Sequence, residues 1–127
     1  MILQKYIANP LLINKRKFDI RVFAIVTSHN GVLKAYFYKE GYLRTSCKEY
    51  NLTNLHSRMV HLTNDAVQQN SEDYGKYEPG NKLSYLDFQK YLNANHKDLC
   101  VDFERDLVPQ IQKLVTDTIR ATFHKID

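Results

Sequence analysis

The sequence predicts an α+β protein, in which an antiparallel β-sheet is followed by two helices that cover one face of the sheet. Residues 17–40 combine period-two alternation with β-branched and aromatic residues, which favours strands. After residue 84, apolar residues recur at steps of three and four, the spacing of an amphipathic helix. Because the chain has only 127 residues, we expect a single domain over residues 1–127.

The first half of the chain predicts three strands. Residues 2–7, ILQKYI, favour a short strand that ends before Pro10, since proline fixes φ and pushes the residue before it into extended or turn geometry. Residues 17–28 form the second expected strand. An Asn-Gly pair at 30–31 predicts a tight turn, and residues 32–40 the third strand, so we expect an antiparallel hairpin.

The second expected strand begins with charges at every second position. Lys17, Asp19 and Arg21 therefore share one face of the strand. The run from Val22 to Val26 is apolar on both faces, which predicts a central strand covered from above and below. We expect the charged row to lie over a cleft. The three groups either pair with one another, as Asp19 with Lys17 or Arg21, or are reserved for a charged ligand.

After the hairpin the pattern is weaker. Residues 41–59 show no sustained period and predict irregular chain, with at most a short strand at 42–45. Residues 70–81 combine glycine, proline and polar side chains, which predicts a loop. There is no internal repeat and no low-complexity tract.

Two helices are expected in the second half. Ser84 and Asp87 approximate a capping box before the apolar positions of the first helix. An apolar stripe from Leu107 predicts the second. Pro109 is compatible with a helix only in its first turn, which places the N-cap near Asp106. The apolar positions of the two helices are Tyr85, Phe88, Tyr91, Leu92 and Leu107, Ile111, Leu114, Val115, Ile119.

Composition and charge narrow the function classes. No apolar run reaches the roughly 20 residues that span a bilayer, and the first residues do not resemble a secretory signal, so we expect a cytoplasmic protein without membrane contact. Cys47 and Cys100 stand far apart and form no metal or redox motif, so both are expected to be free thiols. The net charge of +4 favours acidic partners. Nucleic acid is not expected, because the basic patch Lys15–Lys17 is short and lacks an aromatic binding signature.

Six blocks of sequence, taken in order, resemble the tubulin tyrosine ligase and tubulin-tyrosine-ligase-like family. The resemblance covers residues 3 to about 93 and continues more weakly through the last helix. It implies a partial ATP-grasp fold and an ATP-dependent ligase that joins an amino acid to the acidic C-terminal tail of tubulin through an acyl-phosphate. It also implies the cytoplasm, microtubules and cilia as locations. The blocks are QKYI, PLLI, RKFDIR, YKEGYLRTS, HLTN and YGKYEPGNKLSYLDFQKYL.

The resemblance assigns roles to the charged row. It implies that Lys17 and Asp19 contact ATP, and that Arg21 lies toward the acceptor peptide and the acyl-phosphate. Arg44 matches a family arginine that neutralises phosphate charge in the transition state. Rigid strands that hold an ammonium and a guanidinium suit phosphate and carboxylate oxygens, because arginine offers a two-point fork.

Further nucleotide contacts follow from two other blocks. The hinge segment, which we define as Gln4, Lys5, Tyr6 and Ile7, is implied to meet adenine, with its backbone reading the base edge and its apolar side chains enclosing the ring. In HLTN, Thr63 and Asn64 are implied to approach the nucleotide. His61 in the same block is expected to serve packing and one hydrogen bond.

The resemblance is incomplete at both ends. The upstream lid and the two downstream strands that carry the family's metal pocket are not found, so no metal ligand is assigned and the ligands of Mg²⁺ are expected outside this chain. We expect the 127-residue chain alone to be inactive as a ligase. The alternative function is a non-catalytic fragment or degenerate copy that binds tubulin or microtubules. Whether tyrosine, glutamate or glycine is the free amino acid stays open.

Overall fold

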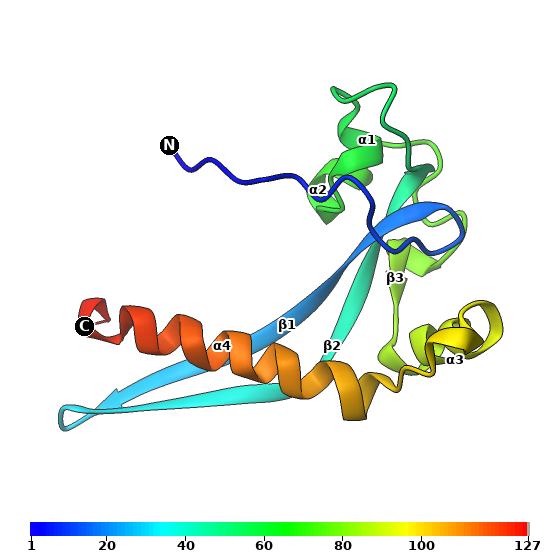
Figure 1. Ribbon diagram of the computed structural model, residues 1–127. Helices are drawn as coiled ribbons and strands as arrows, with labels where there is room; N and C mark the ends of the chain where they lie inside the picture. The colour runs from blue at the N-terminus through cyan, green and yellow to red at the C-terminus, as the bar shows by residue number, and fades with distance from the viewer. Residues whose placement is uncertain (127) are drawn as a thin grey trace. The chain divides into compact units, whose positions relative to one another are not determined.

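The computed structural model describes residues 1–126 as a three-stranded sheet with four α-helices and several single turns (Figure 1). The strands lie in the order β1-β2-β3. The predicted α+β class with an antiparallel sheet is confirmed. The strands are β1 (Arg16–His29), β2 (Val32–Glu49) and β3 (Lys82–Leu83), and the helices are α1 (Arg58–His61), α2 (Asp65–Gln68), α3 (Tyr85–Asn95) and α4 (Val108–Thr122). No helix within residues 1–126 is both long and apolar enough to cross a membrane.

The β1–β2 hairpin is confirmed, and its turn has the expected chemistry. Asn30 and Gly31 take positive φ values of 50° and 76°, as a tight two-residue hairpin turn requires. The expectation of a central strand covered on both sides is wrong, because β1 is an outer strand of the described sheet. In addition, the side chains of Phe23 and Ile25 are 40% and 61% exposed, so this face of β1 is not fully covered.

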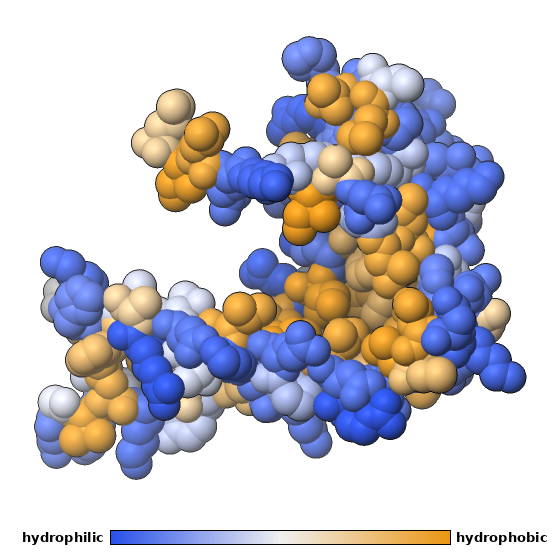
Figure 2. Space-filling view, viewed as in Figure 1, coloured by the Kyte–Doolittle hydropathy of each residue, from blue (hydrophilic) through white to orange (hydrophobic). Residues whose placement is uncertain are grey.

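The strand expected at residues 2–7 is also absent, so that expectation is wrong. The segment forms no regular structure, and its residues are exposed. A strand needs a neighbour for its ladder, and within residues 1–126 the backbone of residues 2–7 forms no hydrogen bond to other backbone. Figure 2 shows apolar side chains of this segment open to solvent.

Strand β2 is longer than the sequence predicts. It continues into the stretch expected to be irregular, past the short strand allowed at 42–45, and ends at Glu49. Residues 50–57 are irregular, as predicted. Leu43 and Arg44 of β2 are paired with Leu83 and Lys82 of β3. The sequence of this part of β2 does not alternate between polar and apolar residues, because residues of both kinds are buried together. The buried residues are Leu43, Thr45, Ser46 and Cys47.

Both long helices form where the sequence predicts them. Ser84 caps α3 by accepting a hydrogen bond from the backbone N–H of Asp87 at 3.0 Å. Helix α4 begins at Val108, with Pro109 in its first turn as expected. A π-helical turn at Phe103–Leu107 precedes α4.

The chain divides into two compact units. The first consists of residues 1–20 and 43–83, and the second of residues 21–42 together with residues from 84 onward. The apolar core of the first unit contains Ile13, Leu43, Cys47 and Val60, and that of the second Phe88, Leu92 and Phe103. In the second unit, α4 and β2 border a cavity of about 410 Å³.

Candidate functional site

Asp19 and Arg44, predicted from separate blocks, form a two-point ion pair between β1 and β2. Arg44 Nε lies 3.0 Å from Asp19 Oδ1, and Arg44 Nη2 lies 2.6 Å from Oδ2. The pair is part-buried, with the two side chains 19% and 34% exposed. Asp19 therefore pairs between strands with Arg44, rather than along its own strand with Lys17 or Arg21. This geometry fixes the plane of the Arg44 guanidinium.

Lys17 connects the hinge segment to the HLTN block. Its Nζ donates to the backbone oxygen of His61 at 2.9 Å and to the hydroxyl of Tyr6 at 3.2 Å. The ammonium also lies 4.6 Å from the centre of the Tyr6 ring, within cation–π range. Three blocks that the resemblance assigns to the nucleotide thus meet at one lysine.

His61 has more contacts than the single hydrogen bond expected of it. Its Nδ1 lies 2.8 Å from the Tyr6 hydroxyl, and its Nε2 lies 2.9 Å from the backbone oxygen of Asn54. The Tyr50 ring packs edge-on against the imidazole, and the Tyr50 hydroxyl donates to the backbone oxygen of Ala8 at 2.8 Å. Partial burial raises the pKa of Tyr50, and the neighbouring Tyr6 side chain adds to the rise.

The other predicted nucleotide contacts lie on loops of the same unit. Thr63 is buried between α1 and α2, whereas Asn64 is exposed just before α2. The carbonyl of Asn64 accepts from Val67 and Gln68 at 3.0 Å each, which fixes this turn. The hinge-segment residues Gln4, Lys5, Tyr6 and Ile7 are exposed.

Arg21 belongs to the second unit, whereas Lys17 and Arg44 belong to the first. Its guanidinium lies 5.4 Å from the centre of the Phe23 ring. Its backbone oxygen accepts a hydrogen bond from the Tyr85 hydroxyl at 3.2 Å. The described contacts of Arg21 are therefore with residues of the second unit.

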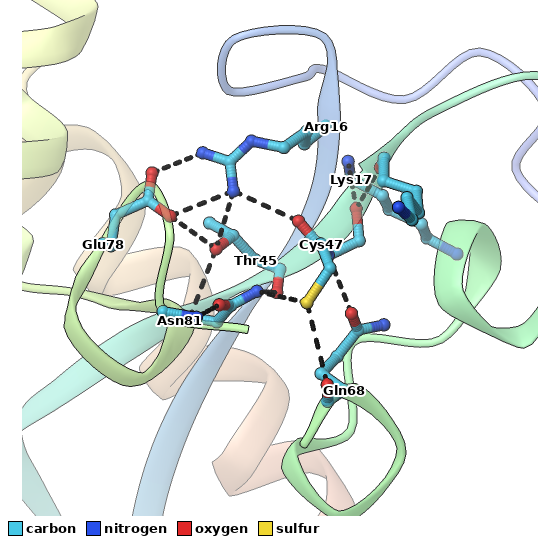
Figure 3. A network of polar contacts seen from close by, with 10 residues as sticks. Arg16, Lys17, Thr45, Cys47, Gln68, Glu78 and Asn81 are labelled. Atoms are coloured by element: carbon cyan, nitrogen blue, oxygen red, sulfur yellow. Dashed lines mark hydrogen bonds and ion pairs between the residues drawn. The ribbon is translucent and has the colours of Figure 1, made fainter. Parts of the chain in front are cut away.

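Sequence reasoning missed a buried polar network around Arg16, which alternates along β1 with Lys17 and Asp19 (Figure 3). Arg16 is 1% exposed and makes a two-point pair with Glu78, with Nη1 to Oε2 at 3.0 Å and Nη2 to Oε1 at 2.5 Å. Arg16 Nη1 also donates to the backbone oxygen of Ser46 at 3.1 Å. Because the Ser46 hydroxyl accepts the backbone N–H of Lys17 at 3.1 Å, Ser46 joins this network to Lys17.

The network continues through side-chain amides and a thiol. Asn81 donates to the backbone oxygen of Thr45 at 2.9 Å and to the Cys47 sulfur at 3.2 Å. The Gln68 side-chain oxygen accepts the backbone N–H of Cys47 at 2.7 Å. Asn81 and Glu78 fall in the predicted 70–81 loop, where nothing but the turn residues Pro79 and Gly80 indicated a fixed structure. Burial of this loop's polar side chains left no signal in the sequence.

The described residues offer no ready metal pocket. Within residues 1–126, no three histidine, cysteine, aspartate or glutamate side chains gather closely enough to hold an ion. Cys47 is buried and Cys100 exposed, and both are free thiols, as predicted.

Comparison with known proteins assigns the chain to a family. The model of the tubulin-tyrosine ligase family matches residues 1–125. The chain belongs to the tubulin-tyrosine ligase family. The six blocks that suggested this family, including RKFDIR and HLTN, all lie inside the matched region.

Relatives of this tubulin-tyrosine ligase family chain include several much longer proteins. It is 34% identical over 121 residues to tubulin glycylase 3B of Tetrahymena thermophila, covering 94% of the chain and 10% of that protein. It is 39% identical over 99 residues to the probable tubulin polyglutamylase TTLL9 of Rattus norvegicus, covering 78% of the chain and 21% of that protein. With the human probable tubulin polyglutamylase TTLL2, identity is 36% over 97 residues, covering 73% of the chain and 16% of that protein. The chain thus spans between a tenth and about a fifth of these relatives.

Proposed function

We propose that this chain is the nucleotide-binding part of an ATP-dependent ligase that adds an amino acid to the acidic C-terminal tail of tubulin. The observation that carries the proposal is the position of Arg44, which Asp19 holds through both Nε and Nη2 in the same unit as the Lys17 ammonium. Positively charged donors held on strands suit the oxygens of phosphate and carboxylate groups. The names of the relatives, tubulin glycylase and tubulin polyglutamylase, support tubulin as the protein substrate.

The chain's own groups suggest how ATP is held. Lys17 and Arg44 supply positive charge for the phosphates, and the exposed Asn64 and the Thr63 hydroxyl lie in the same unit. The backbone groups of residues 4–7 form no hydrogen bond to other backbone within residues 1–126, so they fit a base edge that needs donors and acceptors. The part-buried Asp19 fixes the Arg44 plane, and the rigid guanidinium then stabilises charge that develops on the moving phosphate.

The acceptor peptide and magnesium would contact groups other than those that we assign to ATP. We assign Arg21 to the acceptor glutamate and the acyl-phosphate formed on it, as the family resemblance implies. Magnesium, when bound, would supply positive charge that offsets the charge of the phosphates. Because residues 1–126 form no three-ligand cluster, we expect the ligands of the metal elsewhere in a longer protein.

Nucleotide binding by the chain is the direct test. Titration calorimetry with ATP and magnesium should show binding that Lys17→Ala weakens about tenfold, equivalent to about 1.4 kcal/mol. Lys34→Ala is the matched control, since this exposed lysine lies on the hairpin in the other unit, and it should leave the affinity unchanged. Absence of heat at millimolar ATP, or equal losses from both substitutions, would contradict the proposal.

A non-catalytic tubulin-binding module is the second candidate. It is favoured by the fact that Lys17, Asp19 and Arg44 already have protein partners. A glutamate-rich peptide that binds the chain equally well with and without ATP, while ATP itself gives no heat, would support it. Mass spectrometry of tubulin tails modified by a longer version of the protein would identify the added amino acid, because tyrosine, glutamate and glycine differ in mass.

A further inference from the structure

The hydrogen bonds around His61 determine which ring nitrogen carries the proton. The backbone oxygen of Asn54, 2.9 Å from Nε2, can only accept, so Nε2 must be the protonated nitrogen. In a neutral imidazole the other nitrogen is then an acceptor. The Tyr6 hydroxyl, 2.8 Å from Nδ1, therefore donates to His61.

The Tyr6 hydroxyl also contacts the Lys17 ammonium. Once the Tyr6 proton points at His61, the oxygen of Tyr6 is left to accept, and the Lys17 ammonium donates to it at 3.2 Å. The chain of donors thus runs from Lys17 to Tyr6, from Tyr6 to His61, and from His61 to Asn54. It joins the hinge segment and the nucleotide lysine to helix α1, and every link lies in one unit.

We propose that His61 is a positioning residue of the nucleotide site, which in its neutral form holds Tyr6 and, through Tyr6, the Lys17 ammonium and the hinge segment. This inference rests on the proposed function, because it assumes that the hinge segment and Lys17 bind ATP. Tyr6 is the only residue of the hinge segment whose side chain has a described hydrogen bond within residues 1–126, so docking of the segment depends on it.

Protonation of His61 opposes this arrangement. With both ring nitrogens as donors, the Tyr6 oxygen would have to accept from an imidazolium and an ammonium at once, and two like charges at one oxygen repel. A chain whose His61 ring carries both protons should therefore release the segment.

The neighbours of His61 do not offset this repulsion with a described carboxylate contact. Asp65 of α2 is held by Tyr74 at 2.7 Å and lies 3.7 Å from Lys82. The titratable or charged groups with described contacts to His61 are Tyr6 of the hinge segment, Lys17 of β1, which reaches its backbone oxygen, and Tyr50 after β2. Arg58 lies on α1 itself.

The test compares ATP affinity at pH 8 and at about pH 5.5 in four forms of the 127-residue chain. The unchanged chain should bind ATP about tenfold more weakly at the lower pH. Tyr6→Phe, which removes only the hydroxyl, and His61→Gln, which cannot gain a proton, should each lose most of that ratio. His56→Gln is the matched control, since this exposed histidine lies in the loop before α1, and it should keep the ratio. The phosphates of ATP also change their protonation between these two pH values. The result is therefore the difference in the pH ratio of ATP affinity between the unchanged chain and each variant.

A second measurement separates this inference from the proposed function. Nitrogen-15 spectra of the His61 ring at pH 8 should show Nε2 protonated and Nδ1 free, with a change in the Nδ1 signal in Tyr6→Phe. The opposite tautomer, or an unchanged pH ratio in both variants, would overturn the positioning role while leaving ATP binding intact. Absence of ATP binding at pH 8 in the unchanged chain would overturn the proposed function itself, and the role in nucleotide binding with it.

Discussion

Arg44 and Asp19 face each other between β2 and β1, with the guanidinium held through both Nε and Nη2. Lysine can offer only a point charge here, so Arg44→Lys removes the fork and keeps the positive charge. We expect about tenfold weaker ATP binding by calorimetry, or about 1.4 kcal/mol. The free energy of unfolding should fall by only about 1 kcal/mol, because the pair is part-exposed. Arg58→Lys, on an exposed arginine of α1, is the control, and an equal effect there would contradict the assignment.

The buried pair of Arg16 and Glu78 should matter much more for stability. Glu78→Gln keeps the shape but leaves the Arg16 charge uncompensated, so urea unfolding should show a loss of about 3 to 5 kcal/mol. Glu72→Gln, on an exposed residue of the same loop, should change little. The double variant Arg16→Met with Glu78→Leu should be more stable than Glu78→Gln alone, since it removes both charges. A loss below about 1 kcal/mol for Glu78→Gln would show that the pair is not buried in solution.

Gly41 lies where β2 passes close to a tyrosine. A Cβ at this position would overlap the Tyr85 hydroxyl and the backbone oxygen of Arg21. Replacing glycine by alanine within a strand normally stabilises the folded state by roughly 0.5 to 1 kcal/mol. At Gly41 the overlap makes the same replacement destabilising. We expect Gly41→Ala to destabilise the chain by about 1 to 3 kcal/mol in urea unfolding.

A double variant separates the two overlaps that a Cβ at position 41 would make. Adding Tyr85→Leu should restore only part of the stability, because the backbone oxygen of Arg21 cannot be removed. A stabilised Gly41→Ala variant would mean that Tyr85 does not lie against β2.

The carboxylate of Asp106 supports the turn before α4. It accepts the backbone N–H of Asp102 at 2.8 Å and pairs with Arg105. The hydrogen bond from Arg105, with that from Asp102, lowers the pKa of Asp106 to about 2 from 3.8. Since the folded pKa lies below the unfolded one, the stabilisation is present above about pH 4 and is lost as the pH falls toward 2.

Asp106→Asn should therefore lower the melting temperature at neutral pH and reduce the fall in melting temperature between about pH 4 and pH 2. Asp117→Asn, on an exposed aspartate within α4, serves as the control. Identical acid profiles for the unchanged chain and Asp106→Asn would rule out this role for Asp106.

Several features could be predicted from the sequence because they depend on neighbouring residues. The Asn-Gly turn requires two residues that accept positive φ, and Ser84 with Asp87 caps α3 within one turn. The alternation of Lys17 and Asp19 needs only the period of a strand. The blocks that resemble the family were also readable in order, and the family model confirms them over residues 1–125.

The sequence by itself therefore determined the hairpin, the two long helices and the family, whose signals are local in the chain. The tertiary structure decided that Asp19 pairs with Arg44, that β2 runs on to Glu49, and that Arg16 is buried against Glu78. Arg16 and Glu78 are 62 positions apart, and no short-range period records which distant partner satisfies a buried charge. The choice of partner depends on which segments fold against one another, because a buried polar group is stable only where its partner is brought to it.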